Sequence, residues 1–180
     1  MPNISSHMAV AKRIDELLKI NNDNFYRGNL FPDLFQDKNK SHYKIPGSRY
    51  LIPDIEYVKE NLNLKDKKNL GILTHLLLDK YYLEEYLINI KDNVFESKRI
   101  YNDYDILNKD IIEHFKLDLE KLNNILNNYV EEIDIEKLNK NLDYLNNTKE
   151  GTLEFLNKED FIKFLNNISI RIADEIKEYN

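Results

Sequence analysis

The most apolar stretch of the chain, LGILTHLLLDKYY at positions 70–82, contains a histidine and an aspartate four residues apart. Leucine and isoleucine surround His75 and Asp79 so closely that a helix built from this stretch has hardly any polar face. An ionisable side chain buried in such a helix costs several kcal/mol unless something pairs with it. Because residues four apart lie on one face of a helix, these two side chains can bind one cation from the same side.

Three more residues in the first half of the chain supply the same kinds of donor atom. His7 lies at the start of the first predicted helix, and Asp33 and His42 precede the central helix. Neutral imidazole and carboxylate are ligands of zinc and of similar divalent ions, and they need no thiolate. The sequence therefore predicts a metal site formed by Asp33, His42, His75 and Asp79, with His7 as a further candidate. A core histidine oriented by a neighbouring carboxylate is the competing interpretation of the His75 and Asp79 pair.

The motifs around these residues resemble the zinc-dependent phospholipase C family. They are HMAVAKRI near the N-terminus, then GNLFPDL, SHY and LGILTHLLLDKYY, and together they cover about residues 1–90. The resemblance implies a phospholipase C/nuclease-like all-helical fold with its metals held between helices. It implies one zinc ion among Asp33, His42, His75 and Asp79, with Asp79 bridging to a second ion that His7 also binds.

Two carboxylates are candidate catalytic groups that would position or deprotonate the attacking water. The resemblance implies this role for Asp33, and Glu85 stands about where the family has a further histidine ligand. No His-x-x-x-Glu pair follows, so we expect one centre of one or two ions, zinc or another divalent metal. Zinc lowers the pKa of bound water from about 16 towards about 7 and neutralises charge on phosphoryl oxygens.

Helical periodicity dominates the rest of the chain. Apolar residues at three- and four-residue steps predict helices over 4–20, from Pro53, over 67–88, and in four segments after Tyr101. The stretch 21–52 lacks such a pattern and is predicted to be one long ordered loop. The expected N-caps are Ser5 or Ser6 for the first helix, then Asp66, Asp118, Asp134 and Asn157.

These elements predict an all-α, multi-helix bundle of six to eight helices with one long ordered loop. The length of 180 residues suits a single helical domain, 1–180, whose metal site is built from residues 1–90. The helices after Lys91 carry no recognisable chemistry and are expected to wall the pocket or to mediate assembly.

Composition narrows the classes of partner. The net charge is -6 and the basic residues are scattered, so nucleic acid is not an expected partner. There is no cysteine, no apolar run near the ~20 residues of a membrane span, and no signal-peptide pattern at the N-terminus. We therefore expect a cytoplasmic protein. The resemblance to metal-dependent hydrolases implies a small phosphate-ester substrate. The sequence does not determine its oligomeric state.

Three functions are compatible with these residues. The first is a zinc-dependent hydrolase of phosphate esters with phospholipase C-like phosphodiesterase chemistry. The second is a non-catalytic helical module that binds a partner and retains a structural metal or a polar core. The third is an HD-type phosphohydrolase, which ranks last because the chain contains no adjacent His-Asp pair.

Overall fold

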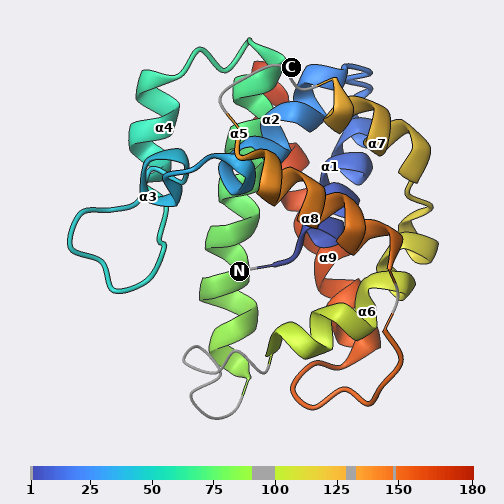
Figure 1. Ribbon diagram of the computed structural model, residues 1–180. Helices are drawn as coiled ribbons and strands as arrows, with labels where there is room; N and C mark the ends of the chain where they lie inside the picture. The colour runs from blue at the N-terminus through green and yellow to red at the C-terminus, as the bar shows by residue number, and fades with distance from the viewer. Residues whose placement is uncertain (1, 91–99, 129–132, 148) are drawn as a thin grey trace.

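Helices form most of the computed structural model, which describes residues 2–90, 100–128, 133–147 and 149–180 (Figure 1). No β-strand occurs in these ranges, so the prediction of an all-α bundle is confirmed. The α-helices are α1 (Ile4–Leu18), α2 (Asp23–Leu34), α3 (Lys38–Ser41), α4 (Ile55–Asn61), α5 (Lys67–Tyr81), α6 (Ile100–Phe115), α7 (Leu119–Asn127), α8 (Ile135–Asn146) and α9 (Lys158–Ile176).

Helix N-caps were predicted well except at the first helix. The side chains of Asp66, Asp118, Asp134 and Asn157 each accept a hydrogen bond from a backbone N–H in the first turn that follows. The first helix begins at Ile4, as predicted, but Asn3 rather than Ser5 or Ser6 is its N-cap: Asn3 Oδ1 accepts from the backbone N–H of Ser6 at 3.0 Å. The predicted continuation of α7 through residues 129–130 lies outside the described residues.

The predicted long loop over 21–52 is wrong in its first half, where α2 forms. This helix contains Gly28 and Pro32, two residues that disfavour helix interiors. Its buried residues lie on more than one side, so no single apolar stripe marks it in the sequence. The chain continues through the short helix α3 and then runs without regular structure to Asp54, which caps α4 in place of a start at Pro53.

Two glycines let α2 and α5 pack with their backbones almost in contact. A Cβ atom added to Gly28 would lie 1.9 Å from the carbonyl oxygen of Lys68, and one added to Gly71 would lie 2.1 Å from that of Phe25. Any larger residue at either position would push the helices apart. Since Gly71 and His75 are one turn apart on α5, this close crossing brings the backbone of α2 to His75.

The predicted central helix over 67–88 is interrupted. Its regular α-helical part ends at Tyr81, and a π-helical turn (Tyr82–Tyr86) and a 3-10 turn (Leu87–Asn89) follow. Asp79 therefore lies in the last regular turn. Side chains from α6 and α9 pack here: the Tyr82 and Tyr104 hydroxyls are hydrogen-bonded, and Phe161 packs against both rings.

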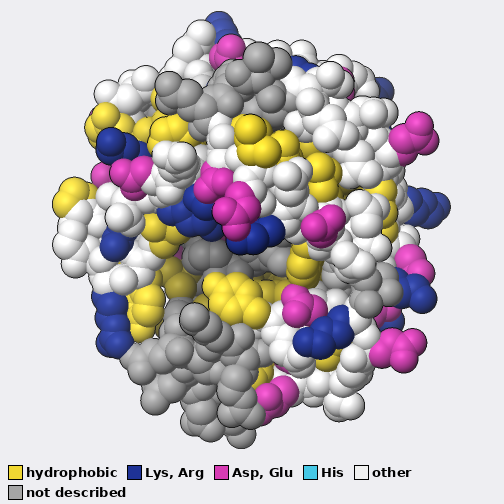
Figure 2. All heavy atoms as spheres, in the orientation of Figure 1, with side chains coloured by type: hydrophobic (Ala, Val, Ile, Leu, Met, Phe, Trp, Pro, Cys, Tyr) yellow, Lys and Arg dark blue, Asp and Glu magenta, His cyan; other side chains and the backbone are white. Residues whose placement is uncertain are grey.

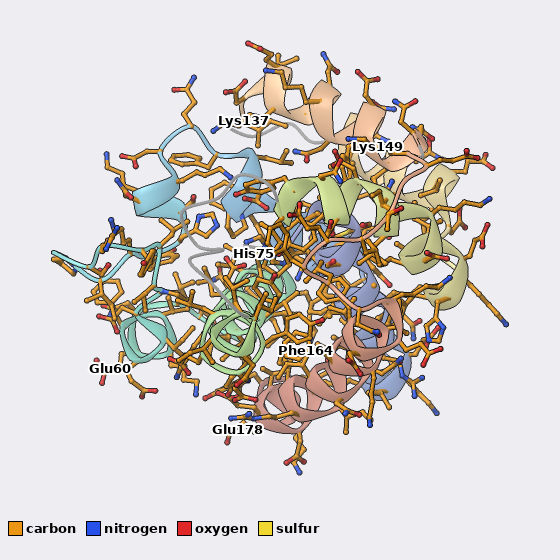
Figure 3. All side chains as sticks on the ribbon, turned by 90° about the horizontal axis from the view of Figure 1, so that it is seen from below. Glu60, His75, Lys137, Lys149, Phe164 and Glu178 are labelled. Atoms are coloured by element: carbon orange, nitrogen blue, oxygen red, sulfur yellow. The ribbon has the colours of Figure 1, made fainter. Side chains whose placement is uncertain are left out.

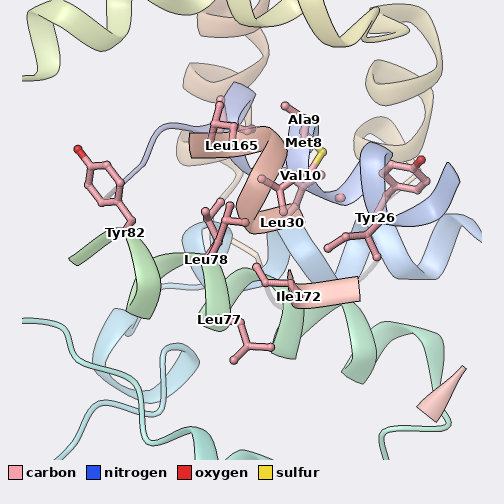
Figure 4. Packing of buried hydrophobic residues seen from close by; sticks show 14 of the residues in the cluster. Met8, Ala9, Val10, Tyr26, Leu30, Leu77, Leu78, Tyr82, Leu165 and Ile172 are labelled. Atoms are coloured by element: carbon pink, nitrogen blue, oxygen red, sulfur yellow. The ribbon is translucent and has the colours of Figure 1, made fainter. Parts of the chain in front are cut away.

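Buried apolar side chains from α1, α2, α5 and α9 meet in the centre of the bundle (Figure 4). Met8, Leu30, Leu77 and Ile172 belong to one continuous cluster that also includes residues of α6 to α8. No helix among the described residues is both long and apolar enough to cross a membrane. The core thus holds α1, α2 and α5 as one rigid frame, and the candidate ligands project from this frame.

Candidate metal centre

The structure brings all five predicted metal ligands together. His7 comes from α1, Asp33 from α2, His42 from the residue that ends α3, and His75 and Asp79 from α5. Two groups have ligand atoms that all lie within 4.8 Å of one another: His7, His75 and Asp79, and Asp33, His42 and His75. Figure 3 shows His75 among the interior side chains of the bundle.

The spacing of the donor atoms matches a small cation. His75 Nε2 lies 3.3 Å from His42 Nε2 and 3.4 Å from Asp79 Oδ2, and His42 Nε2 lies 3.5 Å from the same oxygen. Asp33 Oδ1 is 3.8 Å from His42 Nε2. Ligands of a tetrahedral zinc ion, each about 2.0–2.1 Å from the metal, lie about 3.3–3.4 Å apart. His42, His75 and Asp79 thus have the separations of three corners of such a site.

Hydrogen bonds outside the cluster fix which ring nitrogens face its centre. His75 Nδ1 lies 2.7 Å from the carbonyl oxygen of Asn29, and His42 Nδ1 lies 3.0 Å from that of Lys38. A carbonyl can only accept, so each Nδ1 carries the proton and each Nε2 presents a lone pair. The two Nε2 atoms face each other at 3.3 Å, and two lone pairs at that distance repel unless a positive charge, a metal ion or a proton, lies between them.

Asp79 and His7 are buried without conventional partners. Asp79 is 0% and His7 1% exposed, yet neither carboxylate oxygen of Asp79 and neither ring nitrogen of His7 makes a hydrogen bond. His7 Nε2 lies 3.4 Å from Asp79 Oδ1, and its ring stacks on that of His75 at 3.7 Å. Imidazoles alone satisfy a buried carboxylate poorly, and a bound cation could satisfy these atoms. The two oxygens of Asp79 face different imidazoles, which is the arrangement that a bridging carboxylate requires.

The pKa values in the metal-free cluster follow from burial and from the crowded imidazoles. Burial, helped by nearby His75, lowers the pKa of His7 and lowers that of His42 to about 4, so both are neutral at neutral pH. Burial also opposes charge on His75, but Asp79 outweighs it and raises the pKa of His75. Burial opposes charge on Asp79 too, but the His75 imidazolium outweighs it and holds the pKa of Asp79 well below its usual range. A metal ion would displace the proton from His75.

Asp33 differs from the other ligands because it reaches solvent. Its side chain is 24% exposed, and Lys38 Nζ donates to Asp33 Oδ1 at 2.7 Å. Burial raises the pKa of Asp33, but His75 and Lys38 more than offset this and leave that pKa below its usual range. The sequence did not single out Lys38, because one lysine in a chain rich in lysine carries no distinguishing pattern. The carbonyl of Asn29 could not be found either, since every residue has one.

Glu85, the other predicted catalytic carboxylate, does not join the cluster. It lies in the π-helical turn after α5, is 45% exposed at its side chain, and pairs with Arg171 of α9. Six residues beyond Asp79, it lies on another side of the helix from the ligand face. Glu85 is therefore not one of the clustered donors, and its catalytic role stays a prediction.

The geometry has to be interpreted from physical chemistry alone. No protein-family model matches the chain, and no curated protein or solved structure matches it with significance. What the described residues establish is a buried group of histidine and aspartate side chains that could hold a metal ion.

Proposed function

We propose that the protein is a zinc-dependent hydrolase of phosphate esters with phospholipase C-like phosphodiesterase chemistry. The observation that carries the proposal is the convergence of His42, His75 and Asp79, all buried, with a fourth donor, Asp33, at the solvent side. Zinc held there would supply Lewis-acid chemistry, activating water and neutralising charge on phosphoryl oxygens.

The chain's own groups have distinct tasks in this proposal. Asn29 and Lys38, through their carbonyl oxygens, hold the rings of His75 and His42 with Nε2 inward. Asp33 accepts the proton of the attacking water, because it is the one carboxylate of the cluster with access to solvent. Lys38 keeps Asp33 ionised and in place.

Partial exposure of Asp33 favours a catalytic centre over a structural one. A structural zinc ion has four protein ligands and no vacancy, whereas catalytic zinc keeps a position for water or substrate. Three donors here have separations of 3.3–3.5 Å, and Asp33 is both farther away and bound by a lysine. This leaves one side of the site open toward Asp33.

Metal analysis tests the site itself. Protein purified, treated with chelator and dialysed against zinc should retain one to two ions per chain, and His75→Ala should lose them. His114→Ala is the matched control: His114 is bonded to Asn166 on the surface and lies outside the cluster. A wild-type protein that binds no zinc, nickel, cobalt or manganese would rule out the metal centre.

Turnover separates an enzyme from a binding module. Zinc-loaded protein should hydrolyse bis-p-nitrophenyl phosphate, and Asp33→Asn should lower kcat by about 10²–10⁴-fold while zinc remains bound. Glu85→Gln should leave kcat unchanged. Tight zinc binding with no turnover of any phosphate ester would instead support the alternative, a partner-binding helical module with a structural metal.

A further inference from the structure

A surface hollow adjoins the candidate metal centre at Asp33. It has a volume of about 320 Å³ and lies between α3, α8 and the residues that lead into α1. Figure 2 shows a hollow near the centre of this face, bordered by side chains of lysine or arginine. Its polar lining includes Asp33, Lys38, Tyr101, Lys137, Lys140 and Tyr144.

The charge of this lining is opposite to that of the whole chain. The chain carries a net charge of -6, but the hollow has three lysines and a single carboxylate, Asp33. Lys38 projects from α3, and Lys137 and Lys140 project from one side of α8. The remaining polar lining residues are amides and phenols, which can donate hydrogen bonds to an anion.

The lysines of α8 can turn toward a ligand. Lys140 pairs with Glu136 at 2.6 Å, but both side chains are more than 70% exposed, and such pairs contribute little. Lys137 donates to two neutral carbonyl oxygens, of Phe35 and Gln36, and its ion pair with Asp134, at 4.0 Å, is longer than a hydrogen bond and leaves the ammonium able to bind an anion. In Figure 3, Lys137 lies near one end of α8, and its hydrogen bonds place that end beside Phe35 and Gln36.

The same contacts hold the start of α8 next to the end of α2, where Asp33 lies. The backbone N–H of Asp134 donates to the carbonyl oxygen of Leu34, the residue after Asp33, at 3.0 Å. Together with the bonds from Lys137, this joins the start of α8 to the end of α2. The second half of the chain, in which the sequence showed no chemistry, therefore supplies cations to a hollow that opens at a candidate ligand.

We propose that this hollow is an anion-binding subsite for the phosphate group of a phosphate ester as it approaches the metal centre. The inference rests on the proposed function for the reaction, but the binding of an anion can be tested without it. Lysine ammonium groups bind phosphate oxygens through charge-assisted hydrogen bonds. The size and polarity of the hollow suit a small phosphate-bearing group.

Calorimetry with inorganic phosphate on the chelator-treated full chain isolates the subsite. Lys140→Glu should weaken phosphate binding about tenfold, the loss expected for one charge-assisted contact turned repulsive. Lys109→Glu is the matched control, since Lys109 is likewise exposed and pairs with a glutamate four residues on, Glu113, away from the hollow. Equal effects of the two variants, or no phosphate binding by the wild type, would overturn the subsite.

Kinetics on the zinc-loaded protein separate this inference from the proposed function. Lys140→Glu should raise KM for bis-p-nitrophenyl phosphate severalfold with kcat nearly unchanged, because Lys140 does not contact the cluster. If the Lys140→Glu and Lys109→Glu variants hydrolyse the substrate with identical KM, the subsite would be ruled out. The proposed hydrolase function would be unaffected. If the protein binds no zinc but still binds phosphate through Lys140, the subsite would be supported and the proposed hydrolase function would be ruled out.

A soluble ester and a lipid headgroup present the same phosphate chemistry. Calorimetry with glycerol 3-phosphate and co-sedimentation with vesicles containing phosphatidic acid distinguish the two sources. If the wild type binds either ligand and Lys140→Glu does not, the subsite is supported, and the ligand that binds shows whether the phosphate belongs to a soluble ester or to a lipid. Binding of neither would contradict it.

Discussion

Two buried aspartates in this protein are held in opposite ways. Asp103 of α6 is 0% exposed and accepts hydrogen bonds of 2.7–3.1 Å from the backbone N–H groups of Glu154, Phe155 and Leu156. Asp79 of α5 is equally buried but has no N–H or O–H donor at hydrogen-bonding geometry. Its oxygens face only imidazole nitrogens.

The difference separates a carboxylate that stabilises the fold from one for which we propose a role in metal binding. Backbone N–H donors replace the water that Asp103 loses on burial. These hydrogen bonds also hold the segment that leads into α9 in place. Without a metal ion, Asp79 has mainly the His75 imidazolium to offset the cost of its burial. Burial alone therefore says little about the role of an ionisable residue, whereas the identity of its partners says much.

The largest expected effect on stability is at Asp103. Asp103→Asn should lower the free energy of unfolding by about 3 kcal/mol, because it removes the charge that three buried N–H groups share. Urea denaturation would measure the loss. The same loss should appear with zinc and with chelator, and a loss that depended on zinc would contradict a purely structural role.

Asp79 should behave in the reverse manner. Zinc at a concentration of about 100 times its Kd should stabilise the wild type by about 2.7 kcal/mol, and Asp79→Asn should abolish this gain. In chelator, Asp79→Asn should cost less than Asp103→Asn, because it removes only the attraction between the carboxylate and the protonated ring of His75. Thermal unfolding with and without zinc gives both numbers. A large cost of Asp79→Asn in chelator would show that the carboxylate is already satisfied.

The close crossing of α2 and α5 should matter for both stability and metal affinity. Gly28→Ala forces a methyl group against the backbone of Lys68 and should cost about 2 kcal/mol of stability. It should also weaken zinc binding about tenfold or more, because it moves the Asn29 carbonyl that orients His75. Gly151→Ala is a control, since a methyl group there meets only the flexible side chain of Ile106. Unchanged zinc affinity in Gly28→Ala would show that the carbonyl contact does not matter.

Glu85 should give the smallest effect. Its partner Arg171 and its own side chain are both about half exposed, so Glu85→Gln should change stability by no more than about 0.5 kcal/mol. Zinc affinity should stay the same, because Glu85 has no place in the cluster. Calorimetric zinc titration checks this directly. A weakened zinc affinity would show that Glu85 contributes to the metal site.

The differences between the predicted and the observed fold have local causes. Helices with a single apolar face and an acidic or amide N-cap, such as α7, α8 and α9, follow from the sequence because a three- to four-residue period and a capping side chain are local signals. Helix α2 was missed because it is buried on several sides and contains Gly28 and Pro32. The π-helical turn after α5 has no sequence signature that we recognise.

The candidate ligands were identified from residue type, since histidine and aspartate in an apolar helix require an explanation wherever the helix lies. Glu85 was not recognised as a partner of Arg171, because the sequence does not show which distant helix packs against the turn that follows α5. Lys38, Lys137 and Lys140 were not distinguished from the other lysines, since their common hollow joins segments about a hundred residues apart.

The amino-acid sequence by itself determined the helical class, most helix boundaries and the five side chains with metal-binding chemistry, because helical period, capping and ligand type are properties of short segments. Only the tertiary structure decided that these side chains meet, that Asp79 lacks donors while Asp103 has them, and that α8 brings lysines to Asp33. Those facts depend on packing between distant segments, above all on the crossing of α2 and α5 at Gly28 and Gly71. No local pattern encodes that geometry.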